Sequence, residues 1–547
     1  MIALSFCLGL LLAVFPAAAQ EQAPPGYRIS GVVVDAVTGV PVARAEVSIS
    51  GGTEETKSTA GDDGRFVFQG LEPAKYALTA TAQGYVQEGY NQHGAFQTAI
   101  VVGNGLDSEH LVFPLHRQAI ITGRVIDEHG EAVRQAQIVL FSTDSTGGRR
   151  GRFVQTQMQT DDLGEYRFAR LQAGKYYLAV EGRPWYAQSG LIYVPENGRN
   201  SFGPLTTFGP INRGPSPDPS LDVVYPITFY PGVTEERSAG ELNLTVGDKV
   251  EANIQLQAVP AVHVRLTNLP GAETPIQIGA NEKLFGTLDM GLNVAYAAIS
   301  PGEYEVAGLP PGNVELTLNQ NGSQGSSSRT IKTNVSEGET LDAAKTGATA
   351  NVSGRVIFPA GSTNPAQGHV RLLGEDNQGD FAMLDKDGRF SFEAVQEGDY
   401  KVFVNLAGGD EYVAGISATG AKTVGREITI AGAGDVQLNI TIGRGRGQVA
   451  GVARVDGKPT AGVMVLLVPE TGQNLEEDSR MDQSDSDGTF SLGGILPGRY
   501  SLVAIEDGWG LEWTMGTVLK PYLIKGQTLQ ISPTEQKKVT VDVQHKM

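Results

Sequence analysis

A short pattern of turn and aromatic residues recurs five times along these 547 residues and limits the possible fold more than any other feature. The pattern is Asp, a short gap, Gly, any residue, an aromatic, any residue and an apolar residue, then a Leu-like residue, a Pro/Gly turn and Tyr. Its turn glycines are Gly64, Gly164, Gly302, Gly388 and Gly488. The third copy is the weakest, with Val314 in place of the Tyr. Such self-similarity predicts a tandem array of one kind of module.

The spacing inside this pattern predicts a tight turn that leads into a buried strand. Residues two apart, such as Phe66 and Phe68, project from the same face of a strand, so both rings should face a core. The Asp/Gly pair before them is typical of a hairpin turn, in which Asp bonds its own backbone and Gly takes a positive φ. The Pro/Gly pair after them predicts a second turn, and the Tyr opens the next strand.

A second pattern, apolar-x-Gly-x-Val, precedes every copy of the first except the third. It reads Ile29-Gly31-Val33, Ile121-Gly123-Val125, Val352-Gly354-Val356 and, loosely, Val449-Gly451-Ala453. Gly inside a strand marks a close backbone approach or a bulge. The two patterns together predict an all-β chain, a tandem array of about five Ig-like β-sandwich modules with buried aromatic centres.

The repeat spacing also predicts where the modules begin and end. The turn glycines are 100, 138, 86 and 100 residues apart, so the second module carries an insertion. This insertion, residues 182–232, is rich in Pro, Gly and aromatic residues. We expect β-sandwich modules at residues 27–117, 118–258, 259–347 (divergent), 348–444 and 445–546.

The motifs resemble the carboxypeptidase regulatory-like domain, a transthyretin-like sandwich classed with carbohydrate-binding-like folds. The resemblance covers four modules well and the third poorly, and other bacterial proteins carry this domain in secreted arrays. It implies fold more than activity, because in metallocarboxypeptidases this domain is an accessory beside the catalytic one. The B-type repeats of Gram-positive adhesins look related. Their isopeptide-forming Lys has no counterpart at the Gly-x-Val core, so we expect no isopeptide bonds.

The charge balance excludes one class of partner. The chain has 61 acidic against 42 basic residues, for a net charge of −19. A surface of this sign repels phosphate backbones, so we expect no nucleic acid partner. The acidic groups are better explained as keeping a β-rich surface soluble and limiting edge-to-edge association.

The N-terminus is typical of an export signal. Ile2 to Phe15 form an uncharged apolar run, and Ala17-Ala18-Ala19 supply small residues before a cut at Gln20. We therefore expect a signal peptide at residues 1–19 and a periplasmic, extracellular or cell-surface protein. No second apolar run of spanning length follows, so we expect no transmembrane anchor in the mature chain. Cleavage would also remove Cys7, the only cysteine, and with it any disulfide or thiol nucleophile.

Catalytic and metal-binding motifs are missing from the sequence. None of the seven histidines has a partner at metal-ligand spacing, and neither a G-x-S-x-G elbow nor a Walker-type loop occurs. We expect no catalytic residues, no metal and no cofactor. The turns Asp385-x-Asp387-Gly388 and Asp485-x-Asp487-Gly488 resemble part of a calcium loop, but an EF-hand register would place Ala394 or Gly494 at the last ligand position. A structural turn is the favoured interpretation.

Two aromatic-rich stretches are candidates for sugar binding, because the C–H faces of sugars stack on flat rings beside hydrogen-bonding side chains. One is the insertion, and the other is a late loop with Asp507 and Glu512. The candidate ligand-binding residues are Trp185, Tyr186, Tyr193, Tyr225, Tyr230, Trp509 and Trp513. The alternative is that these rings only close an oversized end of a sandwich.

These observations favour a non-enzymatic, exported, multi-module binding or scaffold protein, with polysaccharide as the expected ligand. Tandem modules would add avidity if several sites engage one polymer. The alternative is a structural spacer or adhesin of the cell envelope that contacts protein partners, which predicts an extended particle. An enzyme or enzyme accessory is the least favoured class.

Overall fold

The computed structural model describes residues 26–51, 55–143, 148, 151–188, 191–192, 212–213, 218–269, 276–300, 302–322, 325–345, 348–359, 368–374, 379–406, 411–471 and 475–546. Five hydrophobic cores follow one another along the chain, with buried residues drawn in turn from 29–115, 119–256, 262–343, 350–442 and 449–541. We call the parts of the chain that supply these cores modules 1 to 5, and we propose that the module boundaries fall between them.

Nearly all regular structure in the described residues is strand. Module 1 contains β1 (Tyr27–Asp35), β2 (Glu46–Ser50), β3 (Thr56–Thr59), β4 (Arg65–Leu71), β5 (Lys75–Thr81), β6 (Glu88–Gly89), β7 (Ile100–Val101) and β8 (Leu111–Leu115). Module 2 contains β9 (Ala119–Ile126), β10 (Gln137–Ser142), β11 (Phe153–Gln159), β12 (Glu165–Leu171), β13 (Gly174–Glu181), β14 (Leu191–Ile192), β15 (Asn212–Arg213), β16 (Val223–Val224), β17 (Thr228–Phe229), η1 (Glu236–Ser238), β18 (Leu242–Leu244), β19 (Lys249–Glu251), β20 (Ile254–Gln255) and β21 (Val259–Pro260).

The remaining modules follow the same style. Module 3 contains β22 (Val262–Thr267), β23 (Ile276–Leu284), β24 (Leu288–Leu292), β25 (Ala295–Ser300), β26 (Glu303–Leu309), β27 (Gly312–Gly322), β28 (Gly325–Val335), β29 (Thr340–Asp342) and η2 (Ala343–Lys345). Module 4 contains β30 (Thr349–Ile357), β31 (His369–Leu373), β32 (Gly379–Met383), β33 (Arg389–Gln396), β34 (Gly398–Asn405), β35 (Glu411–Thr419), β36 (Lys422–Val424), β37 (Glu427–Ile430) and β38 (Gly434–Arg444). Module 5 contains β39 (Gly447–Val455), β40 (Lys458–Pro459), β41 (Met464–Pro469), α1 (Leu475–Asp478), β42 (Arg480–Gln483), β43 (Thr489–Ile495), β44 (Gly498–Ile505), η4 (Gly508–Gly510), α2 (Gly516–Ile524), β45 (Gln527–Ile531) and β46 (Gln536–Gln544).

All five modules share one strand arrangement. In each, the opening strand pairs antiparallel with the strand that carries the aromatic motif and parallel with a late strand. These sets are β1 with β4 and β8, β9 with β12 and β19, β22 with β26 and β29, β30 with β33 and β38, and β39 with β43 and β46. The recurrence of this pairing confirms the predicted tandem array of β-sandwiches.

The opening-strand glycines are sites of close backbone approach. A Cβ built on Gly31, Gly354 or Gly451 would lie only 2.3–2.4 Å from a carbonyl oxygen of the parallel late strand, and one on Gly123 would lie 2.1 Å from the carbonyl oxygen of Ala252, directly after β19. Any side chain there would push the two strands apart, which explains the Gly-x-Val motif. In module 3, Leu266 pairs with Tyr304 as Gly31 pairs with Phe66 in module 1, so the strand order persists where the motif is lost.

The turn motif also has the predicted geometry. The five turn glycines have φ between +73° and +79°, the left-handed region that favours Gly. The motif tyrosines are tied to the turn that precedes them, because each hydroxyl donates to the carbonyl four residues earlier, at 2.8–3.1 Å. These donors are Tyr76, Tyr176, Tyr400 and Tyr500.

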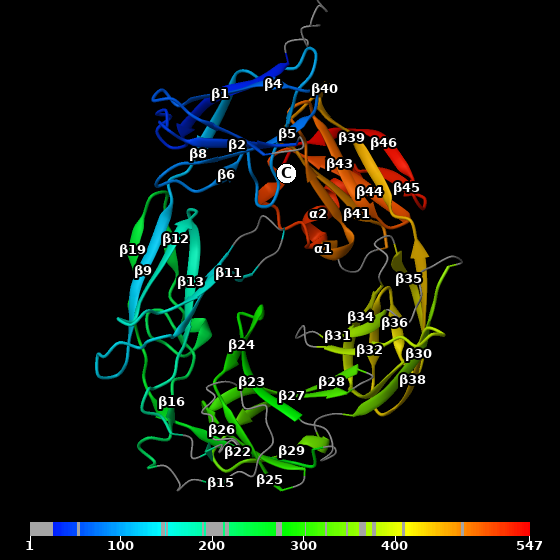
Figure 1. Cartoon of the computed structure of the whole chain (residues 1–547). Coiled ribbons are helices and arrows are strands. Elements are labelled where there is room, and N and C mark those ends of the chain that lie inside the picture. Colours follow the sequence, from blue (N-terminus) through cyan, green and yellow to red (C-terminus); the bar gives the residue numbers. More distant parts are fainter. Residues whose placement is uncertain are drawn as a thin grey trace, which may run out of the picture.

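The five modules form a closed ring rather than an extended string (Figure 1). The chain runs from module 1 at the top, through modules 2, 3 and 4, to module 5, which lies against module 1. The expectation of an extended particle under the spacer hypothesis is therefore wrong. The ring closes because the two ends of the chain contact each other. No local sequence pattern reveals this contact.

Neighbouring modules are joined by different kinds of contact. Modules 2 and 3 share a hydrophobic cluster that includes Phe141 and Met290. Modules 3 and 4 share one nine-stranded sheet, because β28 pairs with β32. Modules 4 and 5 are linked by ion pairs, including Arg426 to Asp478 at 3.0 Å. The hydrophobic cores nevertheless stay separate.

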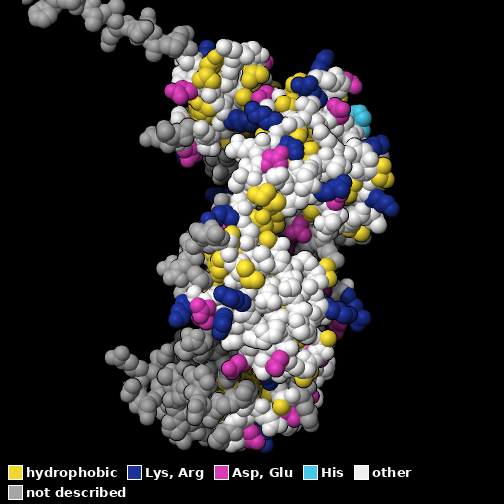
Figure 2. Space-filling view, turned by 90° about the vertical axis from the view of Figure 1, so that its right-hand side faces the viewer, with side chains coloured by type: hydrophobic (Ala, Val, Ile, Leu, Met, Phe, Trp, Pro, Cys, Tyr) yellow, Lys and Arg dark blue, Asp and Glu magenta, His cyan; other side chains and the backbone are white. Residues whose placement is uncertain are grey.

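The surface seen over modules 4 and 5 carries interspersed charges of both signs (Figure 2). Hydrophobic side chains lie in small separate spots on this face. Such a surface is typical of a protein that keeps itself in solution by mixed charge.

Candidate functional site

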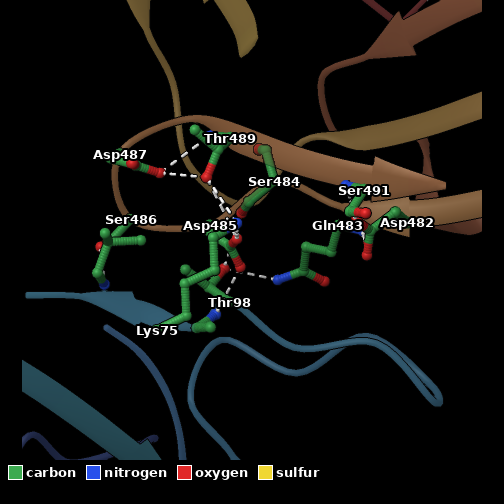
Figure 3. A network of polar contacts seen from close by, with 12 residues as sticks. Lys75, Thr98, Asp482, Gln483, Ser484, Asp485, Ser486, Asp487, Thr489 and Ser491 are labelled. Atoms are coloured by element: carbon green, nitrogen blue, oxygen red, sulfur yellow. Dashed lines mark hydrogen bonds and ion pairs between the residues drawn. The ribbon is translucent and has the colours of Figure 1, made fainter. Parts of the chain in front are cut away.

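The ring closes where the turn of module 5 between β42 and β43 meets β5 and β7 of module 1 (Figure 3). In modules 2 and 4 the motif Asp caps its own turn: Asp385 Oδ1, for example, accepts the backbone N–H groups of Asp387 and Arg389, both at 2.8 Å. The equivalent Asp485 faces module 1 instead. Its Oδ1 accepts the N–H of Ala99 at 3.2 Å, and its Oδ2 pairs with the ammonium of Lys75.

Gln483 is the centre of this contact. Its Nε2 donates to the carbonyl of Asn91 at 2.6 Å and to Thr98 Oγ1 at 2.7 Å. Its Oε1 lies 3.1 Å from Nδ1 of His93. Gln483 and Thr98 are each only 1% exposed. A buried amide with its donors and acceptor engaged is costly to misplace, so this group specifies one docking geometry.

Backbone contacts extend the junction along β7. The N–H of Ser486 donates to Ala99 O at 2.9 Å, and Ser486 Oγ accepts the N–H of Val101 at 2.8 Å. Lys75 is half exposed and also donates to Thr489 Oγ1 at 2.8 Å. Nearby, burial raises the pKa of Asp482, whose carboxylate accepts the N–H of Ser491 at 2.7 Å. The junction is therefore rich in hydrogen bonds, and its ion pair lies at the rim.

The ring of Trp509 forms the apolar part of this junction. His93 lies flat on the indole, with ring centroids 4.8 Å apart and an interplanar angle of 7°. Phe96 adds a tilted contact at 5.7 Å. The indole is held from its own module, because Nε1 donates to Gly462 O at 3.1 Å. A Cβ on Gly462 would lie 2.5 Å from Asn91 Nδ2, so a side chain at this position would push module 1 away.

The candidate aromatic residues of the insertion have contrasting environments. Trp185 is 86% exposed and contacts Tyr186 edge-on, with centroids 5.8 Å apart. The hydroxyls of Tyr186 and Tyr225 both donate to the carboxylate of Glu128, the second at 3.2 Å. Burial, with a smaller contribution from Glu128, raises the pKa of Tyr186 to about 12. Trp185 is therefore an exposed ring that packs against a half-buried tyrosine, which Glu128 holds in place.

The other candidates lie elsewhere. Tyr225 is buried, and Tyr230 packs against the core of module 2. Tyr193 lies outside the described residues. Trp509 and Trp513 are buried in a cluster of module 5 with Leu519 and Tyr522. Neither indole presents a free face to a sugar in this structure, so sugar binding by Trp509 and Trp513 stays a prediction. Both rings meet other modules: Trp509 contacts His93 of module 1, and Trp513 lies against Gly148 of module 2.

The sequence analysis did not find the partners of Trp509. His93, Gln483 and Lys75 carry no motif that marks them, and they meet only because the ring closes. The turn that carries Asp485 has the same motif as the turn that carries Asp385, so the sequence gives no signal that this Asp is an interface residue.

One cluster of possible metal ligands occurs among the described residues, Asp127, Glu128 and His129. Asp127 Oδ1 already accepts the N–H groups of His129 and Glu131, at 2.9 and 2.8 Å. Glu128 accepts the two tyrosine hydroxyls described above. These carboxylates therefore act as a turn cap and as an anchor for aromatic residues. Within the part of the chain that the structure describes, none of the helices is long and apolar enough to cross a membrane.

Comparison with known proteins gives a family match in the first two modules. Residues 28–105 and 120–200 match the carboxypeptidase regulatory-like domain. Among solved structures, the TIE protein of Bacillus anthracis is 10% identical, over 95% of this chain and 69% of that one, with a TM-score of 0.15. The minor pilin GBS52 of Streptococcus agalactiae is 11% identical, over 43% and 97%, with a TM-score of 0.20. The major pilin BcpA of Bacillus cereus is 11% identical, over 79% and 100%, with a TM-score of 0.15. No curated protein matches the sequence.

Proposed function

We propose that this chain, whose first two modules match the carboxypeptidase regulatory-like domain, is a non-enzymatic, exported scaffold that presents binding surfaces on a closed ring of β-sandwiches. The observation that carries this proposal is the contact between modules 1 and 5. Its buried side chains hydrogen-bond across the junction and join the two ends of the chain. A ring held in this way keeps its surfaces in fixed relative positions, which suits a multivalent binder.

Polysaccharide is the ligand class we propose, and the Trp185–Tyr186 pair supports it. An exposed indole offers a flat face to the C–H groups of a sugar. Tyr186 is anchored through its hydroxyl to Glu128, so the platform loses little freedom when a ligand binds. Carboxylate and hydroxyl groups beside the rings can hydrogen-bond to sugar hydroxyls.

A second candidate is a structural protein of the cell envelope that contacts other proteins. The nine-stranded sheet shared by modules 3 and 4 supports it, since a continuous sheet makes a stiff frame. The proposed partners are then envelope proteins rather than polysaccharides. In either case the protein acts after export, once residues 1–19 have been removed.

Binding to immobilised polysaccharides by the purified mature protein tests the ligand class. We expect Trp185→Ala to weaken binding about tenfold, or roughly 1.4 kcal/mol. Leu163→Ala, at another exposed apolar residue of module 2, is the control and should bind as the parent does. A folded parent protein that retains no polysaccharide would exclude this ligand class and favour the envelope-protein alternative. Hydrolysis of a glycan or peptide by the same material would contradict the non-enzymatic assignment.

A further inference from the structure

We infer that Trp509 is a sugar-stacking platform that His93 of module 1 covers in the closed ring, and that release of the junction between modules 1 and 5 opens it to a polysaccharide. This inference rests on the proposed function, because it concerns the same ligand class. It assigns a second site and a reason for the ring to open. The buried aromatic loop of module 5 would then be a covered site.

The first support is the geometry of the stack. The imidazole lies on the indole at 4.8 Å and 7°, a face-to-face contact of two flat rings. A sugar ring that presents its C–H face to an indole lies in the same way. Trp509 is held by the carbonyl of Gly462 and by the apolar cluster of module 5. Its orientation is therefore set by its own module and does not require module 1.

The second support is the polar chemistry that module 5 presents to module 1 in the same junction. The side chain of Gln483 and the carboxylate of Asp485 belong to module 5, yet module 1 supplies most of their partners. Sugar hydroxyls can both donate and accept hydrogen bonds, so they can take the places of the module 1 groups that bind Gln483 and Asp485. An indole, an amide and a carboxylate on the surface of module 5 that module 1 covers have the composition of a site that orients a sugar.

The third support is that the junction can separate without damage to either sandwich. The buried residues of module 1 form one core, and those of the module 5 sandwich form another. The groups that cross the junction are mainly polar and regain hydrogen bonds from water when they part. Among the described side chains of module 1, His93 stacks on Trp509 and Phe96 makes a tilted contact with it. Interfaces of this kind between domains commonly open and close.

The closed form is favoured without ligand, since opening exposes the indole and breaks the network around Gln483. A polysaccharide that binds only the open form shifts this equilibrium by its affinity for that form. Its apparent affinity is reduced in proportion to the small open fraction. Variants that weaken the junction should therefore bind the polysaccharide more tightly than the parent protein does. The experiment tests for this increase in affinity, which is unusual for a variant that loses contacts.

The experiment uses the mature chain, residues 20–547, which has no cysteine of its own. Ala99→Cys with Ser486→Cys creates a reversible lock, since these residues share a backbone hydrogen bond of 2.9 Å across the junction. His93→Ala with Lys75→Ala creates the released form. Dextran, xylan and glucomannan are the probes, with binding followed by affinity electrophoresis and by tryptophan fluorescence, and opening followed by small-angle scattering.

We expect the released form to have a larger radius of gyration and at least tenfold tighter binding to one of these polysaccharides. The protein locked by the disulfide should lose this tighter binding, and reduction of the disulfide should restore it. In the released background, Trp509→Ala and Gln483→Leu should each remove the gain, the second while keeping the indole. A released form that scatters like the parent, or that opens and gains no binding to any of the three, would overturn the inference.

Trp185→Ala in each background separates this inference from the proposed function. If it removes binding in both the closed and the released forms, and release adds nothing, the proposed function stands and the Trp509 site is refuted. If neither the closed nor the released form binds any probe, both fail. A gain on release that survives Trp185→Ala and disappears with Trp509→Ala identifies the covered site itself.

Discussion

The junction between modules 2 and 3 and the junction between modules 1 and 5 are built in opposite ways. At the first, Phe285 of module 3 inserts among Phe141, Tyr177 and Phe229 of module 2, with centroids 4.8–5.8 Å apart. The guanidinium of Arg152 lies over the rings of Tyr177 and Phe285, at 3.8 and 4.5 Å. At the second, amide, carboxylate and hydroxyl groups make most of the contacts.

The difference shows which junction can serve as a hinge. Separating modules 2 and 3 would expose several aromatic rings to water, a cost that grows with apolar area. Separating modules 1 and 5 exchanges protein hydrogen bonds for bonds to water, which costs much less per contact. Of these two junctions, the polar one between modules 1 and 5 should therefore open more readily.

The largest expected effect is at the apolar junction. Phe285→Ala should lower the free energy of unfolding by on the order of 2–3 kcal/mol, below the 3–5 kcal/mol of a fully buried phenylalanine because this ring is only partly buried. Urea denaturation followed by intrinsic fluorescence measures it, and Phe285→Leu should cost less. A loss below about 0.5 kcal/mol would mean that the rings do not hold modules 2 and 3 together.

An intermediate effect is expected at the junction between modules 3 and 4, where β28 meets β32. Burial raises the pKa of Asp380 from an ordinary 3.8 to about 7, although its carboxylate accepts the N–H of Ser328 at 2.5 Å. The folded state then binds this proton more tightly than the unfolded chain does. Stability should accordingly fall as pH rises between about 4 and 7, by up to roughly 1.4 kcal/mol per pH unit.

Asp380→Asn should remove this contribution, because the amide keeps an acceptor oxygen and has no charge to bury. The difference in unfolding free energy between this variant and the parent, measured in urea at pH 5 and pH 8, should favour the variant more at pH 8. Asp399→Asn, at an exposed carboxylate nearby, is the control. Equal differences at the two pH values would show that Asp380 is not responsible.

The smallest effect is expected at the rim of the polar junction. Lys75→Met removes the pair with Asp485, and half-exposed ion pairs of this kind contribute about 0.2–1 kcal/mol. The melting temperatures of the modules should hardly change, while the radius of gyration should rise, most clearly at low salt where the parent pair is strongest. Lys57→Met, which breaks a pair with Glu46 inside module 1, should leave the radius unchanged. The same increase in both variants would show that the Lys75 pair is not special.

Local sequence patterns predicted the features that depend on near neighbours. The positive φ of Gly388 and Gly488 follows from the turn alone, and the close approach at Gly354 follows from the pairing of two strands in one module. The repetition of one sandwich along the chain followed from the repeated spacing of these residues, and the structure adds the strand order that the copies share. Even module 3 keeps it, with Leu266 in place of the glycine.

Features that depend on distant partners could not be predicted in this way. Asp385 and Asp485 occupy the same position in the same motif, yet one caps its own turn and the other binds residues of module 1. Nothing within the motif records which surface the turn will meet. Trp185 and Trp509 looked equivalent for the same reason, and only the ring contact separates the exposed indole from the covered one.

Closure also determines how many repeats this architecture can hold. In an open stack each repeat touches only its neighbours, so copies can be gained or lost at either end with little penalty. Here the angles between successive modules must add up so that Gln483 of module 5 reaches Thr98 of module 1. Duplication or deletion of a single module would leave both surfaces unmatched. We therefore expect evolution to change the loops and sheet faces of the modules while the number of modules stays constant.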